Sequence, residues 1–178
     1  NFKPSVTLDM ERGDLAVFGA VAVIPSTPVS DDGTTPFIIP GENSGGNRTC
    51  AEAAEVFGVD KFSHTTGKVD YNDGNFSGSF PGFAVNTDGS NVSWSYTPPA
   101  GFCVVNMVVI VKGGNDANVY FYDSPVYGDS GLASPLVGVE NTAGLSNLTF
   151  CYNLEPCNGD EDCWKGETAW TDGPRYTN

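Results

Sequence analysis

The stretch from Phe102 to Tyr122, FCVVNMVVIVKGGNDANVYFY, contains the longest apolar run in the chain and a clear chain reversal. Val104 to Val111 is β-branched almost throughout and apolar at odd and even positions, which is typical of a strand covered on both faces. A glycine-rich turn at 113–116 and a β-rich run at 119–122 follow, so the pattern predicts a hairpin beside a central strand. A buried helix is the alternative, and the shortage of strong helix formers disfavours it.

The composition narrows the class of protein and its partners. The 178 residues include 22 Gly and 12 Pro, as in a β protein with many turns, and they suffice for one domain with appendages. The net charge of −14 predicts repulsion from nucleic acid and from anionic membrane surfaces. No apolar segment approaches the roughly 20 residues of a membrane helix. Because the chain begins at Asn1, we expect a processed, secreted product.

The chain outside the central hairpin predicts further strands and one helix. Thr49 and Glu52 have capping-box spacing, and a glycine at 58 would end a helix over 50–57. Asp73-Gly74 predicts a tight hairpin, and the alternation over 91–97 places Trp94 in the core. With a closing strand at 145–152, the expected fold is all-β, an antiparallel β-sandwich of about seven strands with one short helix.

Composition shifts divide the chain into four parts. Residues 1–24 form an N-terminal strand extension, and residues 25–47, rich in Pro, Gly, Ser and Thr, are expected to be a flexible linker. Residues 48–153 form the β-sandwich, and residues 154–178 form an acidic, disulfide-containing tail.

The motifs of the sandwich resemble those of a group of secreted microbial surface proteins. The shared pieces are V-x-V-K-G-G at 109–114, Y-x-Y at 120–122, D-x-G-L-x-x-P at 129–135 and a closing S-[HN]-x-x-F-C-Y at 146–152. The resemblance covers about Cys50 to Tyr152 and implies a β-sandwich and export rather than a reaction.

Five cysteines in an acidic chain predict disulfides, because no pair has zinc-knuckle spacing and there is one histidine. The resemblance implies a bond between Cys50 and Cys151. Cys157 and Cys163 would then close a small loop in the tail and leave Cys103 as a buried free thiol. A bond from Cys103 to Cys157 or Cys163 stays open as the alternative.

Four acceptor sequons predict N-glycosylation, at Asn47, Asn75, Asn91 and Asn147. Their number is weak support, because random placement gives about two. Asn75 and Asn91 fall on the polar faces of amphipathic strands, where a glycan would displace nothing, and Asn47 falls in the expected linker.

No pattern in the chain predicts an enzyme, a cofactor or a metal site. His64 lies beside Ser63, but no nucleophile-elbow pattern surrounds a serine, so a solvated loop histidine is the better interpretation. Acidic stretches at 70–73 and 160–162 lack the glycine and distal glutamate of a calcium loop.

The N-terminal strand carries the functional hypothesis. Asp14 to Ile24 is apolar on both faces, so as a strand it needs cover on two sides. Its large apolar side chains are Leu15, Val17, Phe18, Val21, Val23 and Ile24. The strand could fold back into its own sandwich or complete the sandwich of a second copy. The second choice makes the protein a self-assembling subunit of a glycosylated extracellular filament.

A carbohydrate-binding or adhesin module is the alternative function. Its stacking platforms would be aromatic side chains, because an aromatic face suits the apolar face of a sugar. The candidates are Trp94, Tyr120, Tyr122, Trp164 and Trp170.

Overall fold

A computed structural model of the chain describes residues 24–39, 46–137 and 141–157. The strands are β1 (Ile24–Pro25), β2 (Phe37–Ile38), β3 (His64–Thr65), β4 (Val69–Asn72), β5 (Asn75–Phe76), β6 (Phe83–Thr87), β7 (Asn91–Tyr96), β8 (Phe102–Gly113), β9 (Asp116–Tyr122), β10 (Gly128–Ala133), β11 (Leu136–Val137), β12 (Asn141–Thr142) and β13 (Leu145–Pro156), and the helix is α1 (Cys50–Phe57). Seven of the described strands have four or more residues, and the strand pairs are antiparallel. The predicted all-β fold is therefore confirmed.

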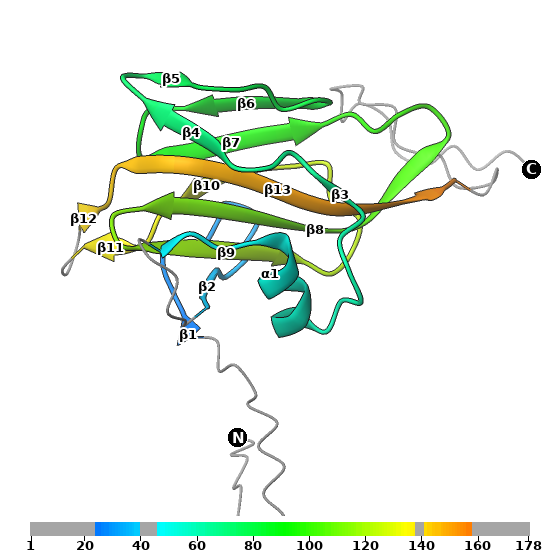
Figure 1. Cartoon of the computed structure of the whole chain (residues 1–178), viewed down its shortest axis with the longest axis horizontal. Coiled ribbons are helices and arrows are strands. Elements are labelled where there is room, and N and C mark those ends of the chain that lie inside the picture. The colour runs from blue at the N-terminus through cyan, green and yellow to red at the C-terminus, as the bar shows by residue number, and fades with distance from the viewer. Residues whose placement is uncertain (1–23, 40–45, 138–140, 158–178) are drawn as a thin grey trace, which may run out of the picture.

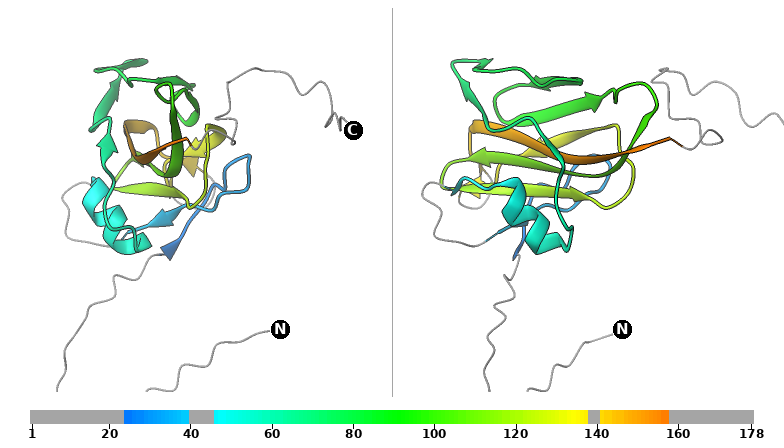
Figure 2. Two further views of the ribbon diagram at one scale, coloured as in Figure 1. Left: turned by 90° about the vertical axis from the view of Figure 1, so that its right-hand side faces the viewer. Right: turned by 45° about the vertical axis from the view of Figure 1, so that its right-hand side comes forward.

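The strands form two main sheets (Figure 1). The large sheet has the order β1-β2-β9-β8-β13-β4-β5, with β3 also paired to β13, and the small sheet has the order β10-β7-β6. A two-stranded sheet of β11 and β12 lies at one end. Figure 2 shows the small sheet stacked over one face of the large sheet and α1 on the other face.

The predicted central strand is confirmed as β8, paired with β9 on one side and β13 on the other. Met107 and Val109 face the small sheet, whereas Val108 and Ile110 face the helix, and each of these side chains is at most 1% exposed. Both faces of β8 are therefore dry, which explains why its sequence does not alternate between apolar and polar residues. The alternative of a buried helix is wrong.

Aromatic rings fill the space between the two sheets. Phe150 of β13 contacts Phe83 at a ring-centroid distance of 4.1 Å and Trp94 at 5.6 Å. Trp94 is 4% exposed, as its alternation predicts. Large rings bury much apolar area each, so this layer supplies a large part of the hydrophobic stabilisation.

The helix covers the opposite face and has the caps that its sequence predicts. The Thr49 hydroxyl accepts from the Glu52 N–H, the Glu52 carboxylate accepts from the Thr49 N–H, and Gly58 ends the helix at φ 66°. Ala53 of α1 and Ile39 pack with Val108 and Ile110 of β8 in the second core.

The hairpin glycine of the V-K-G-G motif is required by packing. A Cβ on Gly113 would overlap the carbonyl oxygen of Gly144 and the side chain of Ser134, which lie on the neighbouring chain segments. Lys112 bends back to donate from Nζ to the carbonyl oxygen of Gly114 at 2.7 Å. The motif therefore encodes a close approach of three chain segments.

The expectation of a flexible linker over 25–47 is wrong for the residues that the structure describes. Ile24 and Pro25 pair with Ile38 and Phe37, and Phe37 pairs with Val119 of β9. Residues 24–39 thus extend the large sheet at its β9 side, and Ile39 is 2% exposed. The composition is that of a linker, but side chains from β9 and β10 hold this segment in place.

The β-sandwich ends later in the chain than predicted. β13 runs to Pro156, so the strand continues past the expected domain end at 153. Residues 158–178 lie outside the described part of the chain. Within the described ranges, no helix has the length and hydropathy to cross a membrane.

Candidate subunit interface

The predicted interface residues Leu15, Val17, Phe18, Val21 and Val23 lie outside the described residues. Ile24, the last of them, pairs with Ile38 as part of β1, the outermost strand at one edge of the large sheet. The apolar stretch therefore joins the domain at a sheet edge.

Two side chains of β9 hold the segment that follows β1. The Asn118 amide donates from Nδ2 to the carbonyl oxygens of Thr27 at 3.0 Å and Ala133 at 2.9 Å. The Tyr120 hydroxyl donates to the carbonyl oxygen of Pro28 at 2.8 Å and accepts from the Ala133 N–H at 3.0 Å. Burial raises the pKa of Tyr120 to about 12, so its hydroxyl stays a donor at physiological pH.

Asp129, at the start of the D-x-G-L-x-x-P motif, makes a third attachment. One carboxylate oxygen accepts from the Tyr122 hydroxyl at 2.7 Å, and the other accepts from the N–H groups of Asp32 at 3.2 Å and Ser130 at 2.7 Å. The carboxylate is 8% exposed, and hydrogen bonds to a buried charge are stronger than those between neutral groups. Burial and the contact with Asp129 raise the pKa of Tyr122.

Asp31 completes the attachment through backbone and side chain. Its N–H donates to the carbonyl oxygen of Ser130 at 2.8 Å, and its carboxylate accepts from the Ser130 hydroxyl at 2.7 Å. Gly131 has φ 71°, and a Cβ there would overlap the Asp31 carboxylate. Partial burial and then the charges of Asp129 and Asp31 raise the pKa of Asp32.

These residues form one connected group of contacts, which we call the anchor. It consists of Asn118, Tyr120, Tyr122, Asp129, Ser130 and Gly131, and it holds residues 27–32. The anchor joins the segment that follows Ile24 to β9 of the large sheet and to β10 of the small sheet. No local sequence pattern marks these residues, although polar atoms in a strand with two dry faces require buried partners.

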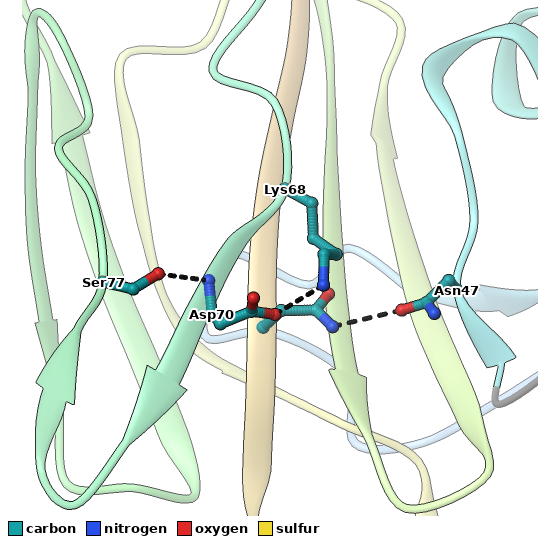
Figure 3. A network of polar contacts seen from close by, with 5 residues as sticks. Asn47, Lys68, Asp70 and Ser77 are labelled. Carbon is teal, nitrogen blue, oxygen red and sulfur yellow. Dashed lines mark hydrogen bonds and ion pairs between the residues drawn. The ribbon is translucent and has the colours of Figure 1, made fainter.

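Two of the four sequons face each other in the folded protein (Figure 3). Asn147 of β13 is 6% exposed and donates from Nδ2 to Oδ1 of Asn47 at 3.2 Å. A glycan would be attached to that buried Nδ2, so the expected modification of Asn147 is incompatible with the folded chain. Asn47 itself is half-buried against β13 and does not lie in a free linker.

The same figure shows how the neighbouring strand is held. Lys68 forms an ion pair with Asp70 at 2.7 Å, and the Asp70 N–H donates to the Ser77 hydroxyl at 3.2 Å. Both charged side chains are about half-exposed, so we expect this ion pair to add little stability.

The other two sequons are exposed, as predicted. Asn75 donates from Nδ2 to the carbonyl oxygen of Asp73 at 3.0 Å, and Asn91 donates from Nδ2 to the Asp88 carboxylate at 3.1 Å. Asp88 also accepts from the N–H groups of Ser90 and Asn91. Its hydrogen bonds, first those from Asn91, lower the pKa of Asp88 to about 2.

The predicted bond between Cys50 and Cys151 is confirmed and ties α1 to β13. Cys157 bonds to Cys103, so the expected tail loop with Cys163 and the expected free thiol at Cys103 are wrong, and the alternative of a bond from Cys103 to Cys157 is confirmed. The reason is strand pairing, because β8 and β13 run side by side and bring 103 next to 157. Cys163 lies outside the described residues.

Three of the five candidate sugar platforms are buried. Trp94, Tyr120 and Tyr122 are at most 8% exposed and cannot stack on a ligand, whereas Trp164 and Trp170 lie outside the described residues. The ring of His64 is stacked on Tyr152 at 5.2 Å and the side chain is exposed. Within the described ranges, no group of three or more His, Cys, Asp or Glu side chains is placed to hold a metal ion.

Comparison of the chain with protein-family models, with curated proteins and with solved structures found no match.

Proposed function

We propose that the protein is a structural subunit of an extracellular glycosylated filament. In this proposal the apolar stretch before Ile24 of one copy, residues 14–23, inserts into the sandwich of the next copy, while Ile24 stays in β1 of its own domain. The contact is head-to-tail and does not close on itself, so it propagates into a fibre.

The observation that carries the proposal is the position of Ile24. The apolar stretch before it needs cover on both faces, but both faces of β8 at the centre of the large sheet are already covered by the domain's own residues. Ile24 lies at the outer edge of that sheet. A second copy can supply the cover that the apolar stretch needs, because the central strands of its own domain have no free face.

The anchor suits a filament subunit. A strand donated to a neighbour carries the tension of the fibre at the point where it leaves its own domain. Here that point is followed at once by residues 27–32, which side-chain and backbone hydrogen bonds fasten to β9 and β10. If residues 27–32 were a flexible linker instead, they would connect two subunits without fixing the position of one relative to the other.

An extracellular location is consistent with the cross-links and the charge. The two disulfides indicate an oxidising environment, where such bonds persist. The net charge of −14 and glycans on Asn75 and Asn91 would keep fibres apart by repulsion and bulk.

Removal of the N-terminal extension tests the proposal. We expect the full-length chain at neutral pH to form filaments in negative-stain electron microscopy, and a chain without residues 1–23 to stay monomeric with an unchanged melting temperature. A peptide of residues 14–24 should bind the truncated chain and raise that temperature. Filaments formed by the truncated chain would contradict the proposal.

A matched pair of variants separates apolar insertion from a nonspecific effect of added charge. Val17→Asp with Val21→Asp should abolish assembly, because buried carboxylates without partners strongly disfavour insertion. Ser5→Asp with Thr7→Asp adds the same charge outside the apolar stretch and should leave assembly intact.

A further inference from the structure

We propose that the site which receives the N-terminal strand is the outer edge of β6, in the small sheet of a second copy. This inference rests on the proposed function and deepens it, because it names the acceptor. The occupant is the stretch Leu15–Val23, added antiparallel or parallel to β6 as one more strand.

The backbone of β6 is open on one side among the described strands. β6 pairs with β7 alone. The Thr97 N–H donates to the carbonyl oxygen of Gly82, and the Asp88 N–H donates to that of Asn91. Because backbone groups in antiparallel strands alternate in direction, the N–H and C=O groups of Val85 point away from β7. An added strand can use these groups.

The other sheet edges suit a donated strand less well. β1 and β5, at the edges of the large sheet, have two residues each. β10 is the outer strand on the far side of the small sheet, but a register shift lies between Asp129 and Leu132, and Ser130 already accepts from the Asp31 N–H. Among the described strands at a sheet edge, β6 is the one that both has at least four residues and pairs without a register shift.

A cluster of partly exposed rings lies beside this edge. We call it the edge cluster, and it consists of Tyr71, Phe76, Phe80 and Phe83. Neighbouring rings are 5.0 Å apart for Tyr71 and Phe76 and 4.9 Å apart for Phe76 and Phe80. Phe80 and Phe83 reach the core ring of Phe150 at 5.7 Å and 4.1 Å.

The edge cluster bridges the two sheets where they lie open to solvent. Figures 1 and 2 show β5 and β6, the free edges of the large and small sheets, on the same side of the molecule. All four rings are partly buried and pack against the core between the sheets. A strand beside β6 would cover them and remove apolar area from water.

The side chains of the donated stretch match the two sides of β6. Phe83 and Val85 are half-buried toward the core, and Ala84 and Asn86 are exposed. In the donor, the odd positions Leu15, Val17, Val21 and Val23 are large and apolar, with Gly19 between them, whereas the even positions are three alanines, at 16, 20 and 22, and Phe18. The odd face would lie on the edge cluster, and the even face, on which Phe18 is the one large side chain, would lie beside Ala84.

The topology excludes the same contact within one copy. β1 and β5 lie at opposite edges of the large sheet, six strand spacings apart, which is about 29 Å at about 4.8 Å each. Figures 1 and 2 place β1 at one end of the molecule and β6 beside β5 at the other. Val23 is bonded to Ile24 in β1, so their Cα atoms are about 3.8 Å apart. A strand of residues 15–23 therefore cannot lie along β6 of its own copy.

Site-specific photocrosslinking in the full-length protein tests the acceptor. Ala84→p-benzoylphenylalanine places the crosslinker on the exposed face of β6, and Ser95→p-benzoylphenylalanine places it at the paired position in the middle strand β7. Mixing ¹⁵N-labelled with unlabelled chains distinguishes crosslinks between copies from those within one copy. We expect position 84 to crosslink to residues 15–23 of another copy, and position 95 to do so much less.

The outcomes separate this inference from the proposed function. Filaments whose crosslinks from position 84 avoid residues 15–23 would overturn the β6 acceptor and leave filament formation standing. Crosslinks to residues 15–23 of the same copy would overturn both, and so would a chain that stays monomeric at every concentration.

A matched charge pair gives a second test. Lysine on an edge strand opposes strand addition, so Ala84→Lys should raise the concentration required for assembly by about tenfold or more. Ser95→Lys adds the same charge at the cross-strand position and should leave that concentration unchanged. Equal assembly by the two variants would overturn the β6 acceptor.

Discussion

The side-chain amide of Asn118 donates to the backbone carbonyl oxygen of Thr27, 91 positions earlier in the chain. With Tyr120 and Asp129 it turns a segment of linker-like composition into a fixed part of the domain. The point at which residues 1–23 join the domain is therefore held against both main sheets.

Loss of the Tyr120 hydroxyl should loosen the anchor. Tyr120→Phe leaves the Ala133 N–H and the Pro28 carbonyl oxygen without this partner, which costs about 1–3 kcal/mol of stability. Hydrogen exchange should quicken at the amides of residues 30–32 more than elsewhere. Tyr71→Phe, which removes a hydroxyl from a half-buried tyrosine outside the anchor, is the control. Equal exchange in the two variants would show that the anchor does not depend on this hydroxyl.

Peptide mapping without reduction should recover one peptide pair joined through Cys103 and Cys157. Removing this bond by Cys103→Ser with Cys157→Ser should destabilise the fold by about 4 kcal/mol in the chain-entropy model, because the bond spans 54 residues. Thermal unfolding of the variant measures the loss. Recovery of Cys157 joined to Cys163 would refute the pairing.

The carboxylate of Asp88 should stabilise the β6–β7 turn in a pH-dependent way. Its pKa in the folded chain is about 2, below the ordinary 3.8, so its contribution is full above about pH 4 and is lost as the pH falls toward 2. Asp88→Asn should therefore show a weaker loss of stability than the wild type between pH 4 and 2. Parallel stability curves for the two proteins over this window would contradict the assignment.

Glycosylation should occur at the sequons whose asparagine side chain is exposed and not at the buried one. Enzymatic deglycosylation in ¹⁸O-water converts each modified asparagine into labelled aspartate, which mass spectrometry locates. We expect label at Asn75 and Asn91 and none at Asn147, because the Asn147 amide is buried against Asn47. Label at Asn147 in folded protein would contradict the conclusion that its burial against Asn47 excludes a glycan.

The elements that sequence predicts well are those whose signal is local. The apolar run of β8, the capping box at Thr49 and Glu52, and the Asp73-Gly74 hairpin each depend on a few consecutive residues. The alternation around Trp94 likewise predicts its burial from its neighbours. Local propensity and tertiary structure agree at these positions, as expected of a chain with low frustration.

The features that sequence reasoning missed depend on partners far away in the chain. Residues 24–39 have no periodicity, and their order comes from side chains about ninety positions later. The bond between Cys103 and Cys157 is one of the alternatives that cysteine spacing leaves open, and only the register of β8 with β13 decides between them. The sequon at Asn147 is a three-residue pattern, whereas its burial is a property of the whole sheet.

If the chain is glycosylated, the burial of Asn147 ties its modification to the timing of folding. The amide is open to an oligosaccharyltransferase only until β13 joins the sheet and Asn47 closes over it. A bare Asn147 beside occupied Asn75 and Asn91 means that folding preceded sugar transfer to this site. Chains modified at Asn147 would be those in which β13 joined the sheet late.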